Sequence, residues 1–431
     1  MKKTFAKGIS ILLTVIMVAL SITGCAPDTK QQNSNTQENP SSGQATQTLK
    51  PCKLTFWHTY GDGEEEQLKK VVLPKWSALH PEITIEPVRQ DGGQFHQMIV
   101  TAFGTGQTPD VARIDIVNTA SYAKQGGIIA LDDMKGFGEL KESFLKAPMS
   151  TNYYKNKYYG LPLDTNCKSA VVNQNTMKKI GLDKIPATME EFIAAAEKNG
   201  GGKFRLNVSG VGDWDLFPYF WLFGGELTDA NFTKASGYID SEASIKAIQT
   251  MLDLNAKKVF TIRDVNGSVD AWDGIKTGEY AMFFEGPWFF GSYSDTAAAG
   301  IIPSTIPTYN GKTTSVVGGE NIAIFENSKN KNEAYEFIKF MASEEIQLDM
   351  LQKGQLPVLK SLVTNKAVTD NPVWSVYMKQ MESARARIPS PNHTEIGQIW
   401  SDAMTNIFAN KADVKKELAK AATLIDEQLK G

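Results

Sequence analysis

The sequence predicts an α/β protein in which two domains follow a secretory leader. Short apolar strands alternate with amphipathic helices over most of the chain, which implies a parallel sheet covered on both faces. Roughly 380 residues follow the leader and its linker, too many for one ordinary hydrophobic core. The first residues combine lysines with a short apolar run, as secretory signals do.

The N-terminal segment predicts export and lipidation. Lysines at positions 2, 3 and 7 precede an apolar run, Ile9 to Leu20, which is shorter than the ~20 residues of a spanning helix. The run ends in Ile-Thr-Gly-Cys, which resembles a bacterial lipobox. This resemblance implies a signal peptide over residues 1–24 and a diacylglycerol on Cys25. An uncleaved anchor with an incidental cysteine is the weaker alternative.

Residues 25–49 predict a disordered tether, because they are rich in Gln, Asn, Ser and Thr and contain no aromatic residue. We therefore expect the folded part at the extracellular face of the cell membrane, or on the periplasmic side of a Gram-negative cell. The net charge of −3 and the pI of about 6.0 do not indicate a nucleic-acid surface. No metal-binding motif or cofactor motif occurs, and a disulfide between Cys52 and Cys167 stays open.

The folded part begins with three predicted strand–helix units. A strand at 53–57 leads to a helix at 64–80, whose apolar residues recur at helical spacing. The following units are a strand at 82–88 with a helix at 94–103, and a strand at 109–116 with a short helix ending at the glycines of 126–127. In such sheets ligands bind beyond the C-terminal ends of the strands.

The pattern then continues to the end of the chain. Thr188 followed by Glu191 predicts a capping box at the start of a helix. Further elements are expected as an aromatic hairpin at 152–164, a strand and helix at 169–183, a helix around Trp221 with its indole in the core, a helix at 242–258, strands at 278–288 and 314–326, two helices at 331–354, an extended piece at 356–363 and a helical tail at 394–429.

Five stretches, in this order, resemble the extracellular solute-binding proteins of bacterial ABC importers, in the maltose and multiple-sugar group. They are "LTFWHTYG", "GQTPDVARIDIVNTASYAKQGGIIALDD", "YYGLPLDTNCKSAVVNQNTMKKIGLDKIPATMEEF", "IKTGEYAMFFEGPW" and "GGENIAIFENSKNKNEAYEFIKFMASEEIQLDMLQKGQLPVL". The resemblance implies a two-lobed periplasmic-binding-protein type II fold with a ligand cleft at the hinge. The implied lobes are 50–163 with 318–357, and 164–317 with 358–431, joined by crossings near 162–167, 316–319 and 356–360.

The same resemblance implies a membrane-anchored receptor that captures a sugar or oligosaccharide. A ligand that contacts both lobes favours their closed arrangement, which a permease can recognise. The expected partners are a carbohydrate, the transmembrane subunits of an ABC permease and, through the lipid, the membrane. We expect a monomer that needs no cofactor and is not an enzyme.

Sugar recognition needs planar groups that pair with hydroxyls and flat rings that stack on C–H faces. Asp115 ends a strand and either caps the next helix or contacts ligand. Asp164 and Asn166 lie at the first crossing, where a hinge turn is the structural alternative. Glu320 is a further polar candidate, and Gly319 would allow close approach of the backbone.

Aromatic candidates lie at two strand ends. Trp288 follows Gly-Pro after an apolar strand and is the preferred stacking residue, while Trp214 is a loop candidate. Arg387, in an arginine-containing loop, would grip hydroxyl groups or form a surface salt bridge.

The turn "FWHTYGDGEEE" supplies the remaining candidates, Trp57, His58, Tyr60 and Glu64. Phe56 is assigned to the core, and the three rings after it are expected to be exposed at the cleft rim.

Two other functions remain open. A non-sugar solute would keep the transport role: a glycerol-phosphate-type ester would need basic groups and helix N-termini, and a polyamine would need acids boxed by aromatic rings. A lipid-anchored glycoside hydrolase would need two opposed carboxylates. No nucleophile elbow, P-loop or Ser/His/Asp order supports an enzyme.

Overall fold

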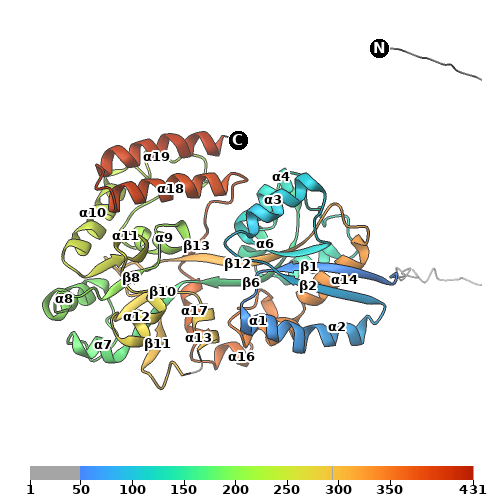
Figure 1. The fold of residues 1–431 in the computed structure, drawn as a ribbon, viewed down its shortest axis with the longest axis horizontal. Helices are drawn as coiled ribbons and strands as arrows, with labels where there is room; N and C mark the ends of the chain where they lie inside the picture. Colours follow the sequence, from blue (N-terminus) through green and yellow to red (C-terminus); the bar gives the residue numbers. More distant parts are fainter. Residues whose placement is uncertain (1–48, 294, 431) are drawn as a thin grey trace, which may run out of the picture. The chain divides into compact units, whose positions relative to one another are not determined.

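The computed structural model describes residues 49–293 and 295–430, so the predicted signal peptide, Cys25 and nearly all of the tether lie outside the described residues. Two sheets organise the described chain (Figure 1). We call the six-stranded sheet with its helices the first half, and the five-stranded sheet with its helices the second half.

The first half has the strand order β13-β12-β3-β1-β2, with β6 also paired to β12. The strands β1, β2 and β3 are parallel, as expected, whereas β12 runs antiparallel to both β3 and β6. The sheet is therefore mixed. Its strands are β1 (Cys52–His58), β2 (Ile83–Arg89), β3 (Val111–Asp115), β6 (Leu161–Cys167), β12 (Ser315–Ile324) and β13 (Ala384–Arg385).

The second half has the strand order β11-β7-β10-β8-β9. The expected aromatic hairpin is present as β4 (Tyr153–Tyr154) and β5 (Lys157–Tyr158), joined by two residues with positive φ, as tight hairpins require. The strands of the five-stranded sheet are β7 (Ser169–Asn173), β8 (Leu206–Val208), β9 (Phe260–Ile262), β10 (Met282–Glu285) and β11 (Ile301–Ser304).

Helices surround both sheets (Figure 1). The described α-helices are α1 (Asp62–Gln67), α2 (Leu73–Leu79), α3 (Phe95–Thr105), α4 (Thr119–Lys124), α5 (Phe137–Leu140), α6 (Lys146–Ser150), α7 (Gln174–Lys179), α8 (Met189–Asn199), α9 (Asp213–Leu222), α10 (Glu242–Ala256), α11 (Arg263–Asn266), α12 (Ala271–Thr277), α13 (Trp288–Ser292), α14 (Lys331–Met341), α15 (Glu344–Leu351), α16 (Lys366–Thr369), α17 (Trp374–Met381), α18 (His393–Phe408) and α19 (Val414–Leu429). Short turns of π- or 3-10 helix lie at 68–72, 116–118, 141–143 and 360–362.

Local chemistry explains where these elements differ from expectation. The helix predicted at 64–80 contains a π-turn before Pro74, whose missing N–H disturbs the regular hydrogen-bond ladder. Thr188 caps α8, accepting from the backbone N–H of Glu191, but Glu191 reaches back to Ala187 rather than to Thr188. The helical tail is broken at 409–413 into α18 and α19, and the piece at 356–363 ends in a 3-10 turn.

Each half has its own hydrophobic core, with rings such as Phe56 and Trp76 in the first half and Phe220 and Trp400 in the second. Val358, Leu359 and Leu362 pack in the core of the first half, although the predicted boundary assigned them to the second. The backbone N–H of Leu145 donates to the carbonyl of Val358 at 2.8 Å. Core packing therefore groups this segment with the first half, while the position of the last crossing stays a prediction.

The segments predicted to cross between lobes lie beside one another. In Figure 1, β12 and β6 run between the two sheets, with Gly318 opposite Asn166, and the backbone N–H of Thr165 donates to the carbonyl of Leu356 at 3.0 Å. Cys52 and Cys167 are both free thiols, so they form no disulfide. Within the described ranges, no helix is long and apolar enough to cross a bilayer.

Candidate functional site

A cavity of about 860 Å³ lies where side chains of the two halves meet. Its volume is within the range of roughly 300–1,000 Å³ that is typical of small-molecule sites, and near the upper end of that range. The first half contributes most polar side chains, and the second contributes indole rings. The residues that line the cavity are Thr59, Gly61, Asp62, Gly63, Glu64, Gly92, Phe95, His96, Arg113, Asp115, Asn118, Asn166, Trp272, Trp288, Gly291, Ser292, Glu320, Lys353 and Gln355.

Three predicted acids form a row across neighbouring strands beside this cavity, and two of them, Asp115 and Glu320, line it. In the strand register, Glu320 of β12 faces Asp115 of β3 on one side and Asp164 of β6 on the other. The strand order brings them together although they are far apart in sequence. Like charges directly opposite each other destabilise a sheet, so this row needs compensating cations.

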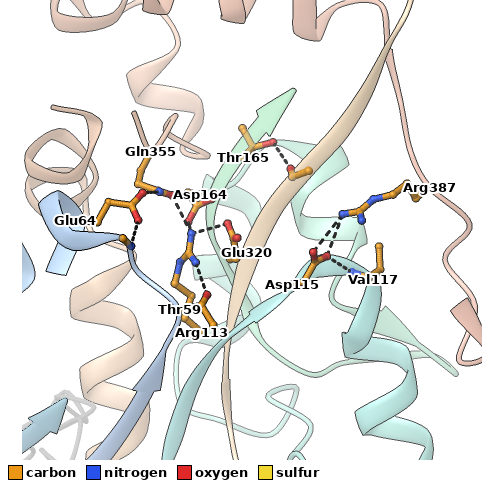
Figure 2. Close-up of polar contacts among 12 residues, drawn as sticks. Thr59, Glu64, Arg113, Asp115, Val117, Asp164, Thr165, Glu320, Gln355 and Arg387 are labelled. Atoms are coloured by element: carbon orange, nitrogen blue, oxygen red, sulfur yellow. Dashed lines mark hydrogen bonds and ion pairs between the residues drawn. The ribbon is translucent and has the colours of Figure 1, made fainter. Parts of the chain in front are cut away.

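Arg113 supplies one of these cations and lies at the centre of the site (Figure 2). Its Nη2 is 2.7 Å from Glu320 Oε2 and 3.3 Å from Asp164 Oδ2, and its Nη1 donates to Thr59 Oγ1 at 3.1 Å. The guanidinium also lies over the ring of Tyr60, 4.5 Å from the centroid. Although burial opposes a charged group, Glu320 and Asp164 together hold the pKa of Arg113 above its usual value.

Burial acts in the opposite sense on the acid beside it. Desolvation raises the pKa of Glu320 well above its usual value, and Arg113 lowers it only in part because Asp164 opposes that effect. Burial and the neighbouring carboxylates therefore disfavour the charged form of Glu320, and Arg113 favours it.

Several buried acceptors at this site have no hydrogen-bond partner in the described structure. They include Asp164 Oδ1 and Asn166 Oδ1, whereas Glu320 Oε2 is paired with Arg113 Nη2 at 2.7 Å. Buried polar atoms are normally satisfied, and an orphaned acceptor is unfavourable. A ligand that brings donors to these oxygens would remove that penalty.

The second half provides an aromatic wall. Trp288 begins α13 after Pro287, and its ring centroid is 5.8 Å from that of Trp214 in the first turn of α9. Gly286 lets the Trp288 ring fold back, because a Cβ there would lie 2.2 Å from the indole. Both tryptophans are partly exposed. Trp214 is therefore helical rather than a loop residue, and it borders the cavity without lining it.

Arg387 connects the aromatic wall to the acid row. Its Nη2 donates to Asp115 Oδ1 at 3.1 Å, and its guanidinium carbon lies 5.4 Å from the centroid of Trp214. Asp115 also accepts from the backbone N–H of Val117 at 3.0 Å (Figure 2). Asp115 therefore caps the following helical turn and also lines the cavity. Arg387 itself is 9% exposed, which is inconsistent with a surface salt bridge.

Glu64 has a structural role as well as a place at the cavity. Its Oε2 accepts from the backbone N–H of Gly61 at 2.7 Å, which caps α1, and its Oε1 accepts from the side chain of Gln355. The other two glutamates of the run pair with Lys69 and Lys70 one turn later. The acidic run thus supports the helix, and only its first member reaches the site.

The expected exposure of two rings is wrong. His58 is 0% exposed and Tyr60 is 1% exposed, and neither lines the cavity. They continue the buried face of β1, on which Leu54 and Phe56 also lie. Every second residue of a strand points to the same face, so this alternation could be read from the sequence. Trp57 lies on the opposite face of the strand and lines a different cavity, beside α3.

The expectation for Gly319 also changes. Its φ is 127°, and a Cβ would lie 2.5 Å from the carbonyl oxygen of Asp164, so the backbone of β6 occupies the space expected for a ligand. Asp164 itself is 3% exposed and reaches the cavity through Arg113 rather than as a lining residue.

Sequence reasoning did not identify Arg113, Trp272, Gln355 or His96. Arg113 had a usable signal, because it precedes Asp115 by two residues in an otherwise apolar strand and so shares its face. Trp272 donates its indole N–H to Glu285 Oε2 at 2.7 Å. The others had no local signal, because they reach the cavity only through folding.

Comparison with known proteins adds a family. A model described as "Bacterial extracellular solute-binding protein" matches residues 61–348. The galactooligosaccharide-binding protein of Bacillus subtilis is 22% identical, covering 99% of this chain and 98% of that protein. Among solved structures, the GacH receptor of Streptomyces glaucescens has a TM-score of 0.79 at 22% identity, covering 88% of this chain and 98% of its own. Maltose-bound MalE3 of T. maritima has a TM-score of 0.75 at 23% identity, with 88% and 99% covered. These likenesses confirm the predicted two-lobed fold.

Proposed function

The chain belongs to the bacterial extracellular solute-binding protein family, and from this premise we propose that it captures a sugar or oligosaccharide and delivers it to an ABC importer. The relatives named for galactooligosaccharide and maltose binding support that substrate class. The size of the cavity, about 860 Å³, favours an oligosaccharide over a single ring.

The observation that carries the proposal is the arrangement of orphaned acceptors opposite an aromatic wall. Asn166 Oδ1 and Asp164 Oδ1 lack donors among the described residues, and Asn166 and Trp288 both line the cavity. A sugar presents hydroxyl donors at its edge and C–H groups on its faces, so one molecule can satisfy both surfaces. Asp115, Glu64 and Arg387 would accept from or donate to further hydroxyls.

Charged ligands fit this cavity less well. An anionic ester would need several free cations, but Arg113 and Arg387 are both held by carboxylates and Glu64 occupies the N-terminal end of α1, so Lys353 alone among the described lining residues could serve it. A polyamine would need uncompensated acids. The same two arginines compensate the acid row, so a neutral polyol matches the electrostatics best.

A binding protein also fits better than a glycoside hydrolase. Hydrolysis needs carboxyl groups on both sides of the scissile bond. The acids that line the cavity are Asp62, Glu64, Asp115 and Glu320, and all belong to the first half or to β12. In the described structure, the second half contributes only Trp272, Trp288, Gly291 and Ser292 to that lining.

Lobe closure would couple capture to transport. We propose that the lobes are the two halves, with the boundaries given by the crossings at β6, β12 and the segment after residue 362. The ligand would stabilise the closed arrangement by touching Asp115 and Glu320 on one side and Trp288 on the other. Lipid on Cys25 would hold the monomer at the extracellular face, next to the permease. Mass spectrometry of the membrane-extracted protein tests the lipid.

A thermal-shift screen tests the substrate class. Maltodextrins, galacto-oligosaccharides, monosaccharides, spermidine and glycerol 3-phosphate are compared at equal concentrations. A ligand at 100 times its Kd stabilises the folded protein by about 2.7 kcal/mol and raises Tm by several degrees. The proposal expects this rise only with carbohydrates. A rise with the amine or the phosphate ester alone would overturn it, and release of shorter sugars would refute the binding role.

A matched pair of variants then tests the site by calorimetry with the best sugar. Trp288→Ala removes the stacking ring and should weaken binding tenfold or more. Trp57→Ala removes a partly buried tryptophan that lines a cavity outside the cleft, so its Kd should stay within about twofold. Equal losses in both variants, or none in Trp288→Ala, would contradict the assigned site.

A further inference from the structure

Two arginine–tryptophan pairs lie side by side along α9. The guanidinium carbon of Arg387 is 5.4 Å from the ring centroid of Trp214, and that of Arg385 is 4.6 Å from the ring centroid of Trp221. The arginines are two residues apart in an extended segment, so they share one side. The tryptophans are seven residues apart on α9, which is two helical turns and again one face.

Each guanidinium is also held by a carboxylate. Arg387 pairs with Asp115 in the cleft. Arg385 pairs with Glu226 through both of its terminal nitrogens, at 3.1 and 2.5 Å. The same three chemical groups, an indole, a guanidinium and a carboxylate, therefore occur twice along α9.

The second group borders a cavity of its own, of about 450 Å³, which lies outside the cleft described above. Three aromatic rings besides Trp221 line it, and one of them, Tyr238, is 38% exposed. Glu226 and Arg385 are each partly exposed, so their remaining hydrogen-bonding capacity is accessible. The residues that line this cavity are Phe217, Trp221, Glu226, Leu227, Thr228, Asp229, Ala230, Phe232, Tyr238, Arg385, Ala386 and Ile388.

Trp221 was expected to be an ordinary core residue, but its indole N–H has no acceptor. The side chain is 8% exposed and Nε1 is buried without a hydrogen-bond partner. Other tryptophans behave as buried indoles usually do: Trp76 donates to Ile83, Trp272 to Glu285 and Trp400 to Val211. The unmet donor belongs to a side chain that lines the cavity, so an acceptor from a ligand that reaches it would remove the cost of leaving it unpaired.

The chemistry of this cavity selects the ligand class. An anion would meet Glu226 and Asp229, and a cation would meet Arg385, so a neutral molecule is favoured. Aromatic rings suit C–H faces, while a carboxylate, a guanidinium and an indole N–H suit hydroxyl oxygens. These are the requirements of a pyranose unit.

We propose that this cavity is a second carbohydrate subsite, in which one pyranose unit accepts from Trp221 Nε1–H and pairs its hydroxyls with Glu226 and Arg385. The assignment of a sugar rests on the proposed function. The unit has two sources: the distal end of an oligosaccharide that occupies the cleft, or a separate free sugar.

The indole N–H resonances of the full chain, labelled with nitrogen-15, test this proposal directly. Assignments come from Trp221→Phe and Trp288→Ala. Glucose, galactose, maltodextrins and galacto-oligosaccharides are titrated in turn. The proposal expects the Trp221 resonance to move downfield as its N–H gains an acceptor, while the resonances of Trp76 and Trp400, which already have acceptors, stay in place.

Comparing short and long sugars, with and without Trp288, distinguishes the two possible sources of the pyranose unit. Movement of Trp221 only with longer chains, and its loss in Trp288→Ala, would identify the distal end of a cleft ligand; movement that survives Trp288→Ala would identify a free sugar. Arg385→Gln should weaken the Trp221 response about tenfold, because it removes a charged hydrogen-bond donor.

Two outcomes would refute the second subsite, and they differ in what they imply for the proposed function. If sugars move Trp288 but never Trp221, the cleft binds carbohydrate and the second subsite is wrong. If no carbohydrate moves either resonance, both the substrate class and the subsite are wrong. An unchanged Trp221 response in Arg385→Gln would remove the guanidinium from the proposed contact.

Discussion

Replacing His58 with phenylalanine tests whether a buried neutral imidazole limits stability in acid. His58 lies between Phe56 and Tyr60, with ring centroids 5.5 and 5.2 Å away, and neither ring nitrogen has a hydrogen-bond partner. Burial lowers the pKa of His58 from 6.5 to about 4; Glu65 partly offsets this effect and Arg113 reinforces it. Phenylalanine fills nearly the same volume and cannot take up a proton.

The sign of the effect follows from proton binding. Between pH 6.5 and about 4 the unfolded state binds more protons than the folded state at this position, so stability falls as the pH falls. The pKa difference corresponds to about 3 kcal/mol in total, and about 2 kcal/mol of this is lost by a pH of about 5. Above the unfolded pKa, the contribution is fully present.

Urea unfolding followed by tryptophan fluorescence measures this contribution. The free energy of unfolding is compared at pH values of about 7.5, 6 and 5 for both proteins. His58→Phe should lose about 2 kcal/mol less than the original protein between the first and last of these values. The same pH dependence in both proteins would refute the reasoning, as would an imidazole resonance of His58 that titrates near its unfolded value.

Three further outcomes concern the cleft. Glu320→Gln removes one of the two carboxylates paired with Arg113 and leaves Asp164 as its partner, so urea unfolding near neutral pH should show a loss of only about 1 kcal/mol. Arg113→Met leaves the acid row without its central cation and should destabilise the protein by about 3–5 kcal/mol in the same assay; a loss equal to that of Glu320→Gln would contradict this role. Gly318→Ala places a Cβ 2.7 Å from Trp214, so calorimetry should show at least tenfold weaker sugar binding, whereas Gly397→Ala, with open space around it, should leave Kd unchanged.

Local patterns predicted much of the fold, because strands and helices depend on residues that are close in sequence. Hydrophobic periodicity and the residues that start or end elements were enough to predict strand β1, the cap at Thr188 and the helices α14 and α15. The exposure of His58 and Tyr60 was misjudged because the rings were assigned to the turn rather than to the alternation of β1. Pro74 indicates that the helical hydrogen-bond ladder is disturbed near it, but the sequence does not specify that the disturbance is a π-turn.

Only some residues of the candidate site could be predicted from the sequence. Asp115 and Trp288 line the cleft and stand at a strand end and a helix start, where ligands of α/β sheets are expected. Glu320 also lines the cleft but lies within β12. Arg113 was overlooked because a charged residue inside an apolar strand has no partner in the neighbouring sequence. Its partners, Asp164 and Glu320, come from two other strands.

By itself the sequence determined the α/β class and the family resemblance, because each depends on local pattern or on the order of short motifs. Only the tertiary structure decided which charges meet. Arg387 and Asp115 are 272 residues apart and form an ion pair because the chain passes repeatedly between the two sheets. The cleft is assembled from segments that are remote in sequence, and the balance between burial and pairing that sets its chemistry exists only once those segments are packed together.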